Sequence, residues 1–181
     1  MKAMTTTGRE IDFDGGRLDS LRARLKGPLF LPGEAGYEES RSVWNAMIDR
    51  RPLAVVRCLG VADVVAAVEF ARQNDLLLAI KGGGHNIAGL AVADGALLLD
   101  LGLMRGVWVD PRRRIARAQG GCLLGDVDRE TQLHGLAAVL GFVSLTGIAG
   151  LTLGGGFGYL TRRFGWTSDN VVAMEVVTAQ G

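Results

Sequence analysis

Two spacings of apolar residues alternate through the middle of the chain. Short unbroken apolar runs at 53–58 (LAVVRC) and 76–80 (LLLAI) are typical of strands buried in a sheet. Between them, apolar residues recur at helical spacing in VADVVAAVEFARQN, residues 61–74. This pattern predicts a strand, a crossover helix and a second strand parallel to the first, with the helix covering the sheet.

Weaker patterns predict the remaining elements. Leucines at helical spacing predict a short helix over 18–27, before Gly27 and Pro28. The segment from Phe30 to Arg51 lacks a sustained period and is expected to be extended, with a helical turn around 43–48. The other expected elements are short strands at 96–101, 106–110 and 114–119 forming an antiparallel meander, helices at 124–134 and 159–165, and a closing strand at 171–180. These elements together indicate an α+β protein.

Glycine is clustered in two places, KGGGHN at 81–86 and TGIAGLTLGGGFG at 146–158. Successive amides in a glycine-rich turn can point inward together and bind an anion such as phosphate. The first cluster also follows a strand, at the sheet edge where ligands of α/β proteins usually bind. Neither cluster matches a P-loop or the GxGxxG dinucleotide pattern. A tight turn without a ligand remains open, and His85 could hydrogen-bond a carbonyl or transfer a proton.

Composition excludes several classes of function. Apolar residues make up 48% of the chain, enough for a packed core, and 20 basic residues nearly balance 19 acidic ones. We therefore expect no nucleic-acid partner and no attraction to an anionic membrane. Two cysteines, Cys58 and Cys122, and two histidines fit no metal spacing, so we expect buried, reduced thiols and no metal site. Because no stretch has the length of a membrane span and the N-terminus lacks a secretory apolar region, the expected location is cytoplasmic.

Several motifs in order resemble one known family. KGGGHNIAG, LLLDLGLMRGVWVD, LTGIAGLTLGGGFGYLTRRFGWTSDN and VVTAQG are similar to the FAD-binding (PCMH-type) domain of the p-cresol methylhydroxylase and vanillyl-alcohol oxidase superfamily, in particular to berberine bridge enzyme-like FAD-linked oxidases. The resemblance runs from about Pro28 to Gly181. It implies a short N-terminal segment at 1–27 and an FAD-binding domain at 28–181, made of two α+β lobes with FAD between them.

The same resemblance implies a set of cofactor-binding residues. In the family, the first glycine loop wraps the FAD pyrophosphate, and its histidine is bonded to the flavin 8α-methyl carbon. The corresponding residues here are Lys81, Gly82, Gly83, Gly84, His85 and Asn86. Further backbone contacts to the pyrophosphate and ribityl chain would come from Thr146, Gly147, Gly150, Gly154, Gly155 and Gly158, and Val176 would meet the adenine side. An imidazole substituent would retain the flavin and make it a stronger oxidant.

One departure from the family concerns the number of covalent links. Members that attach FAD twice have a cysteine shortly before the second glycine motif, and Val143 occupies that place here. Valine cannot form a thioether, and Cys122 lies well upstream. The resemblance therefore implies a single link through His85.

The resemblance also implies what the enzyme would do. It predicts a flavoprotein oxidoreductase in which an alcohol, amine or sugar-type small molecule transfers hydride to FAD. Family members continue into a substrate-binding domain, absent from these 181 residues, so a missing C-terminal domain or a partner chain is expected and no residue is assigned as catalytic. Two alternatives stay open: a nucleotide- or flavin-binding module without catalysis, and an inactive truncated domain.

Overall fold

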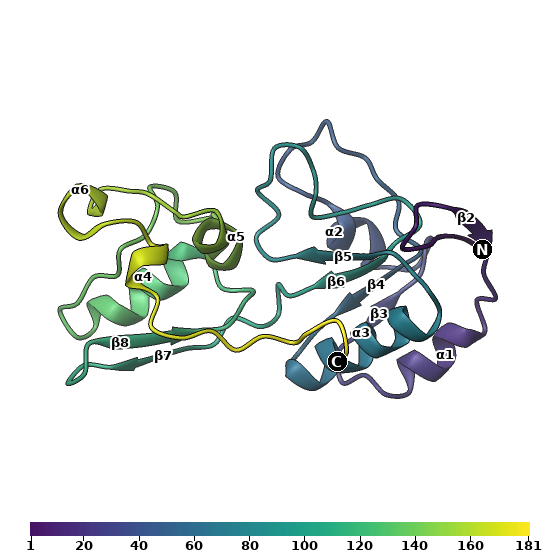
Figure 1. Ribbon diagram of the computed structural model, residues 1–181, viewed down its shortest axis with the longest axis horizontal. Helices are drawn as coiled ribbons and strands as arrows, with labels where there is room; N and C mark the ends of the chain where they lie inside the picture. The colour runs from purple at the N-terminus through teal and green to yellow at the C-terminus, as the bar shows by residue number, and fades with distance from the viewer.

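The computed structural model describes residues 1–181 and shows two lobes side by side (Figure 1). The first lobe contains the four-stranded sheet with α1 to α3, and the second contains the β7–β8 hairpin with α4 to α6 (Figure 1). This is the mixed architecture expected from the sequence. None of the helices combines the length and the apolar character needed to cross a membrane.

The first-lobe sheet has the strand order β3-β4-β6-β5. Its strands are β3 (Leu29–Phe30), β4 (Ala54–Arg57), β5 (Leu78–Lys81) and β6 (Leu97–Asp100). The prediction that β4 and β5 are parallel is confirmed, because each pairs in parallel with β6, which lies between them. The predicted meander is wrong in its first strand: β6 belongs to this sheet, and only β7 and β8 form an antiparallel hairpin.

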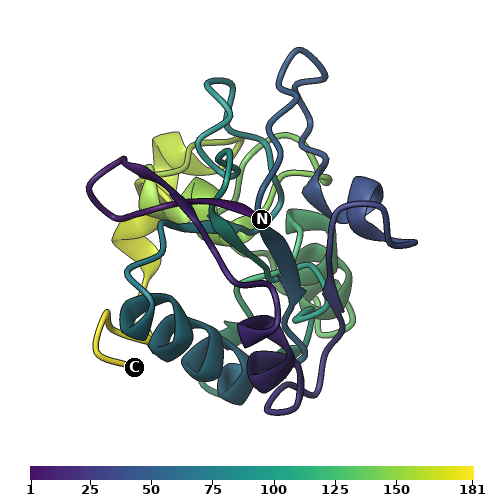
Figure 2. The ribbon, with the colours of Figure 1, turned by 90° about the vertical axis from the view of Figure 1, so that its right-hand side faces the viewer.

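Both faces of this sheet are covered, which explains the unbroken apolar runs of β4 and β6. On one face, Val56 and Leu99 pack with α1 (Arg17–Arg22) and α3 (Val61–Gln73), which lie side by side in Figures 1 and 2. On the other face, Val55 and Leu98 pack against Tyr37 of α2 (Tyr37–Arg41). Alternate residues of each strand thus enter different cores, as the pleat of a strand requires.

The N-terminal residues add to the first lobe. β1 (Lys2–Met4) and β2 (Glu10–Asp12) form an antiparallel hairpin, and Ala3 joins the core under α1 and α3. The helix predicted over 18–27 is present but shorter, ending at Arg22. Its two buried side chains, Leu18 and Leu21, have the spacing that predicted it.

The second lobe is built on a separate small core of Cys122, Leu124, Val127 and Leu140. The hairpin of β7 (Val107–Asp110) and β8 (Ile115–Ala118) packs against α4 (Leu124–Gln132), which ends before Gly135 as predicted. The second glycine region contains a helix that the sequence did not indicate, α5 (Ile148–Leu153), followed by α6 (Thr161–Phe164) and a 3-10 turn, η1 (Ser168–Asn170). Both cysteines are buried and unpaired, as expected.

Two predicted elements differ from the structure. At the predicted helical turn around 43–48 there is only one hydrogen-bonded turn, in which the Ile48 N–H donates to the Asn45 carbonyl at 3.0 Å, and the helix of this region, α2, lies earlier and ends at Arg41. Residues 171–178 pair with no strand, 179–180 form a turn, and Val172 and Val176 are exposed. The apolar, β-branched run within 171–180 matches a strand, but a strand also needs a partner edge, which a local pattern cannot supply. This segment instead runs from the second lobe back to the first, ending beside α3 (Figure 1).

Candidate functional site

The two glycine regions meet where the lobes face each other. Gly83 and Gly147 touch through their backbones: a Cβ placed on Gly83 would lie 2.4 Å from the Gly147 N atom, and one on Gly147 would lie 2.4 Å from the Gly83 N atom. Neither residue could carry a side chain without separating the two segments. At these two positions, close approach of backbone to backbone is therefore itself a reason for glycine.

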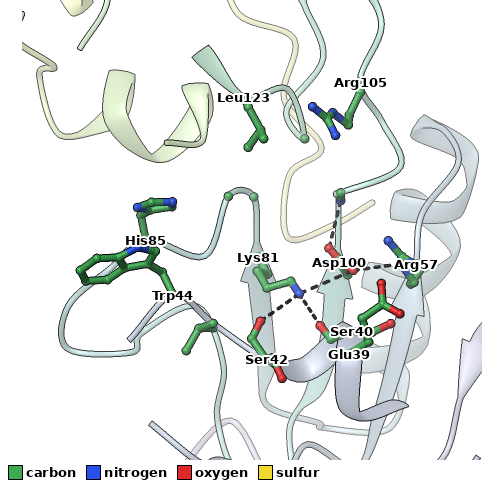
Figure 3. Close-up of a pocket in the computed structure, with 15 residues that line it drawn as sticks. Glu39, Ser40, Ser42, Trp44, Arg57, Lys81, His85, Asp100, Arg105 and Leu123 are labelled. Carbon is green, nitrogen blue, oxygen red and sulfur yellow. Dashed lines mark hydrogen bonds and ion pairs between the residues drawn. The ribbon is translucent and has the colours of Figure 1, made fainter. Parts of the chain in front are cut away.

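A cavity of about 350 Å³ opens beside this contact. Its wall includes Gly82, Gly83 and His85 from the first glycine loop, Trp44 from the 42–50 loop and Leu123 from the second lobe (Figure 3). The volume lies within the range of small-molecule sites. In Figure 3, His85 and Trp44 stand on one side of this cavity and a group of charged side chains stands on the other.

The charged group comes from the carboxyl ends of the three parallel strands. Arg57 of β4 and Lys81 of β5 are each in register with Asp100 of β6, so the three side chains meet at one sheet edge. The Arg57 Nε donates to the Asp100 carboxylate at 3.1 Å, and the Lys81 Nζ lies 3.7 Å from the same oxygen. The other Asp100 oxygen accepts the Gly102 N–H at 3.0 Å. Asp100 therefore holds two cations at the base of the cavity.

Lys81 is engaged on its other side as well. Its ammonium donates to the backbone carbonyls of Ser40 and Ser42, the latter at 3.3 Å. Burial lowers the pKa of Lys81, and the nearby Asp100 carboxylate opposes that shift. Lys81 thus joins the end of α2 to the base of the first glycine loop, although it also lines the cavity.

Arg105 contributes a further cation from the opposite side of the cavity. It forms a two-pronged pair with Asp126 of α4, at 2.8 and 2.7 Å. Burial acts to raise the pKa of Asp126, but the hydrogen bonds from Arg105 and from the Leu123 N–H hold that pKa below its usual value. The pair fixes the connection between β6 and β7 against α4.

The His85 imidazole is stacked on the Trp44 indole, with ring centroids 5.5 Å apart and an angle of 20° between the ring planes. The contact covers one imidazole face, while both ring nitrogens lie in the ring plane. His85 therefore presents a nucleophilic or proton-transferring edge at the cavity wall (Figure 3).

A second cavity, also of about 350 Å³, is lined by the second glycine region and the aromatic side chains of Phe142 and Phe157. Thr146, Gly150 and Gly154 all line it. A Cβ on Gly150 would meet no atom within 4 Å, so the fold itself does not require glycine there. Open backbone of this kind suits close approach of a bound molecule. Val143 lines the same cavity.

Other residues predicted from the sequence lie outside the two cavities. Gly84 has a positive φ of 69°, and its carbonyl accepts the Trp44 N–H. Asn86 caps the turn that follows, accepting the Leu90 N–H at 3.0 Å. The remaining four also lie outside the cavities. Gly147 contacts Gly83, and Gly155 has a positive φ beside Trp166. At Gly158 a Cβ would lie 1.9 Å from the Leu140 O atom, and Val176 is exposed in the C-terminal segment.

Four charged residues of the first cavity, Glu39, Arg57, Asp100 and Arg105, and its stacking residue, Trp44, were not predicted from the sequence. The sequence did contain a signal for two of these residues, Arg57 and Asp100. Arg57 and Asp100 each end a run of buried apolar residues, at the sheet edge where ligands usually bind. For Trp44 and Arg105, no local pattern indicates a place near the glycine loops.

The residues present fit a dinucleotide such as FAD. Glycine backbone and three cations, Arg57, Lys81 and Arg105, line the first cavity against two carboxylates, Glu39 and Asp100, so cations are in excess, which suits phosphates. The second cavity is more apolar and has open backbone at Gly150. The Gly83–Gly147 backbone contact joins the loops that form the two cavities. Together the cavities match a ligand that has a charged middle and a flat apolar end.

Comparison with known proteins supports FAD as the ligand. A model of the FAD binding domain family matches residues 52–181. (R)-6-hydroxynicotine oxidase of Paenarthrobacter nicotinovorans is 38% identical over 157 residues, which are 87% of this chain and 34% of that protein. An FAD-linked oxidoreductase of Dictyostelium discoideum is 37% identical over 158 residues, again 87% of this chain and 34% of that protein.

Solved structures show the same fold. The crystal structure of 6-hydroxy-D-nicotine oxidase from Arthrobacter nicotinovorans superposes with a TM-score of 0.84 at 37% identity, over 86% of this chain and 34% of that one. Phl p 4, a grass pollen allergen with glucose dehydrogenase activity, gives 0.84 at 26% identity, over 91% of this chain and 36% of that one. The chain thus spans about a third of the length of these relatives. It belongs to the FAD-binding domain family of the PCMH type, the family of the FAD-linked and berberine bridge enzyme-like oxidoreductases, and its cofactor is FAD.

Proposed function

We propose that this chain is the FAD-binding part of an oxidoreductase that carries its flavin on His85 through one covalent bond. The observation that carries the proposal is the place of His85. It stands at the wall of the first cavity, two residues after the glycine whose backbone touches the second glycine region. An imidazole there lines the same cavity as the Gly82 and Gly83 amides, which suit phosphate.

The chain's own residues would bind and orient the cofactor. Amides of Gly82 and Gly83 would face the pyrophosphate, with Arg57 and Arg105 compensating its charge across the cavity. Thr146 and Gly150 would contact the part of FAD that enters the second cavity. Asp100 would keep Arg57 and Lys81 in place, because its carboxylate accepts from the Arg57 Nε and lies 3.7 Å from the Lys81 Nζ.

FAD would supply the redox chemistry by accepting a hydride from the substrate. Among the relatives, the names refer to 6-hydroxynicotine and glucose, an amine and a sugar. We propose a substrate of the alcohol, amine or sugar class for the whole enzyme. Because the chain spans about a third of its relatives, the substrate-binding residues would lie on a further domain or on a partner chain.

A single link is proposed because Val143 occupies the position at which a second link would need a thiol. Val143 lines the second cavity beside Thr146, whereas Cys122 is buried in the core of the second lobe and donates to the Gly106 carbonyl. Burial also raises the pKa of Cys122, which disfavours its nucleophilic thiolate.

Peptide mass spectrometry tests the proposal. Trypsin cleavage after Lys81 and Arg105 releases peptide 82–105, which contains His85 as its only histidine. From acid-precipitated yellow protein, we expect this peptide to carry flavin. Peptide 130–162, which contains His134 and Val143, is the internal control and should be unmodified. A flavin-loaded protein whose 82–105 peptide is unmodified would overturn the covalent link.

A second candidate function is a flavin- or nucleotide-binding module without turnover, since glycine-lined cavities suit a nucleotide whether or not chemistry follows. The two are distinguished by adding candidate amines, alcohols and sugars to the flavin-loaded protein without oxygen. Reduction of the flavin by one of them supports the oxidoreductase, whereas a flavin that only dithionite reduces supports the module.

A further inference from the structure

The 42–50 loop lies along the first glycine loop and is bonded to it at several points. The Trp44 N–H donates to the Gly84 carbonyl at 3.0 Å, and the Asn45 side-chain amide donates to the Ile87 carbonyl at 2.8 Å. Further along, the Arg50 guanidinium donates to the Val92 carbonyl at 3.0 Å. The position of Trp44 relative to His85 is therefore set by backbone contacts on both sides of the imidazole.

The 42–50 loop is itself braced from within. Arg41, which is buried at the end of α2, donates to the Asp49 carboxylate at 2.6 Å and to the Arg50 carbonyl at 3.0 Å. It also pairs with Glu38 through its Nε at 2.7 Å. A buried guanidinium that joins both ends of a loop restricts its movement, so the indole is presented from a fixed support.

The indole does not serve as ordinary core. Trp44 is 62% exposed, and it is not part of any apolar cluster, unlike its neighbours Val43 and Ile48. Its one aromatic contact is the offset stack on His85, with 5.5 Å between centroids and 20° between planes. Figure 3 shows the two rings together at the edge of the cavity. A large apolar ring kept at the surface in contact with one imidazole indicates a role tied to that imidazole.

We propose that Trp44 is a positioning residue that holds the His85 imidazole in the orientation needed for its bond to the flavin. This inference rests on the proposed function. Attachment replaces the imidazole N–H and one C–H of the 8α-methyl group by an N–C bond. Two protons and two electrons pass to the flavin, and dioxygen then removes them as hydrogen peroxide. Stacking selects one side-chain orientation of His85 before this bond forms.

The size of the effect follows from the stack. Offset aromatic pairs stabilise their arrangement enough that removing one ring changes the population of that arrangement by about 2-fold to about 12-fold. We expect Trp44→Leu, which keeps apolar bulk but has no ring, to slow covalent attachment by that factor. Trp44→Phe should restore most of the rate because a stacking ring is again present.

The first test needs no flavin. The chain has two histidines, so the apoprotein has two sets of imidazole proton signals, and His134→Gln assigns them. Protons above an indole face are shifted upfield by its ring current. In NMR spectra we expect the His85 signals to move downfield in Trp44→Leu and to stay unchanged in Trp108→Leu. Trp108 is the matched control, being 56% exposed on β7 in the other lobe.

The second test follows acid-precipitable flavin over time after FAD is added to apoprotein. A slower rate in Trp44→Leu, a near-normal rate in Trp44→Phe and an unchanged rate in Trp108→Leu support the inference. If wild type and Trp44→Leu attach flavin at equal rates, or if the His85 signals do not move, the proposed role of Trp44 is overturned. The covalent link itself would still stand. Wild-type protein that binds flavin without any adduct would overturn the covalent link and, with it, this role.

Discussion

Two glycine-to-alanine substitutions separate glycines that the fold requires from glycines that face a ligand. In Gly83→Ala, the new methyl carbon would lie 2.4 Å from the Gly147 N atom and 2.6 Å from its Cα. Non-bonded carbon contacts are normally about 3.5–4.0 Å, so the two segments must separate by about 1 Å. Gly83 does not have a positive φ, so the cost comes from packing and not from backbone conformation.

Overpacking of this kind costs about 1–3 kcal/mol of unfolding free energy. For a chain of 181 residues, 1 kcal/mol corresponds to about 2–4 °C in Tm. We therefore expect Gly83→Ala to lower the Tm of the apoprotein by about 2–12 °C. Gly147→Ala should behave in the same way, because the contact is mutual.

Gly150→Ala, by contrast, should raise the stability of the apoprotein. A Cβ there meets nothing within 4 Å, and the residue lies inside α5, where alanine is favoured over glycine by about 0.5–1 kcal/mol. The apoprotein should therefore be slightly more stable. The same methyl group would project into space that we assign to FAD, and a similar overpacking cost would weaken flavin binding by about 5-fold or more.

The assay combines thermal unfolding without cofactor and quenching of flavin fluorescence on binding. Each glycine variant is also made with His85→Asn, so that FAD binding is reversible and an affinity can be measured. A Gly83→Ala protein as stable as wild type would refute the role assigned to the glycine contact. A Gly150→Ala protein that binds FAD as tightly as its parent would refute the assignment of the second cavity to the cofactor.

Three further predictions concern buried ionisable groups. Asp100→Asn leaves the buried Lys81 ammonium without its carboxylate, so urea titration should show a loss of about 3–5 kcal/mol, and a loss below about 1 kcal/mol would contradict the role of Asp100. Burial raises the pKa of Cys58 to about 12, so native protein should resist alkylation of Cys58 by iodoacetamide at about pH 8 while urea-unfolded protein reacts; equal labelling of both would argue against this burial. Asp126 has a pKa below 3.8 when folded, because hydrogen bonds from Arg105 outweigh the opposing effect of burial, so the unfolded chain takes up this proton first as pH falls. The Tm difference between wild type and Asp126→Asn should be full above about pH 5 and shrink below pH 3.8, and a difference independent of pH would contradict the shift.

Local patterns in the sequence determined much of the first lobe. Apolar runs located β4 and β5, helical spacing located α3, and glycine after a strand located the first loop at the ligand edge of the sheet. These features were readable because each depends on burial of residues near one another in the chain. The order of several motifs, taken together, also indicated the family, which neither glycine loop could do alone.

Only the tertiary structure decided which distant segments meet. It placed β6 between β4 and β5, brought Arg57, Lys81 and Asp100 to one edge, and left residues 171–180 without a strand partner. It also showed that Gly83 and Gly147 are required by each other, and that Trp44 lies on His85. The physical reason is common to all of these: strand pairing, backbone contact and ring stacking depend on groups far apart in the sequence, and no local periodicity records which of them become neighbours.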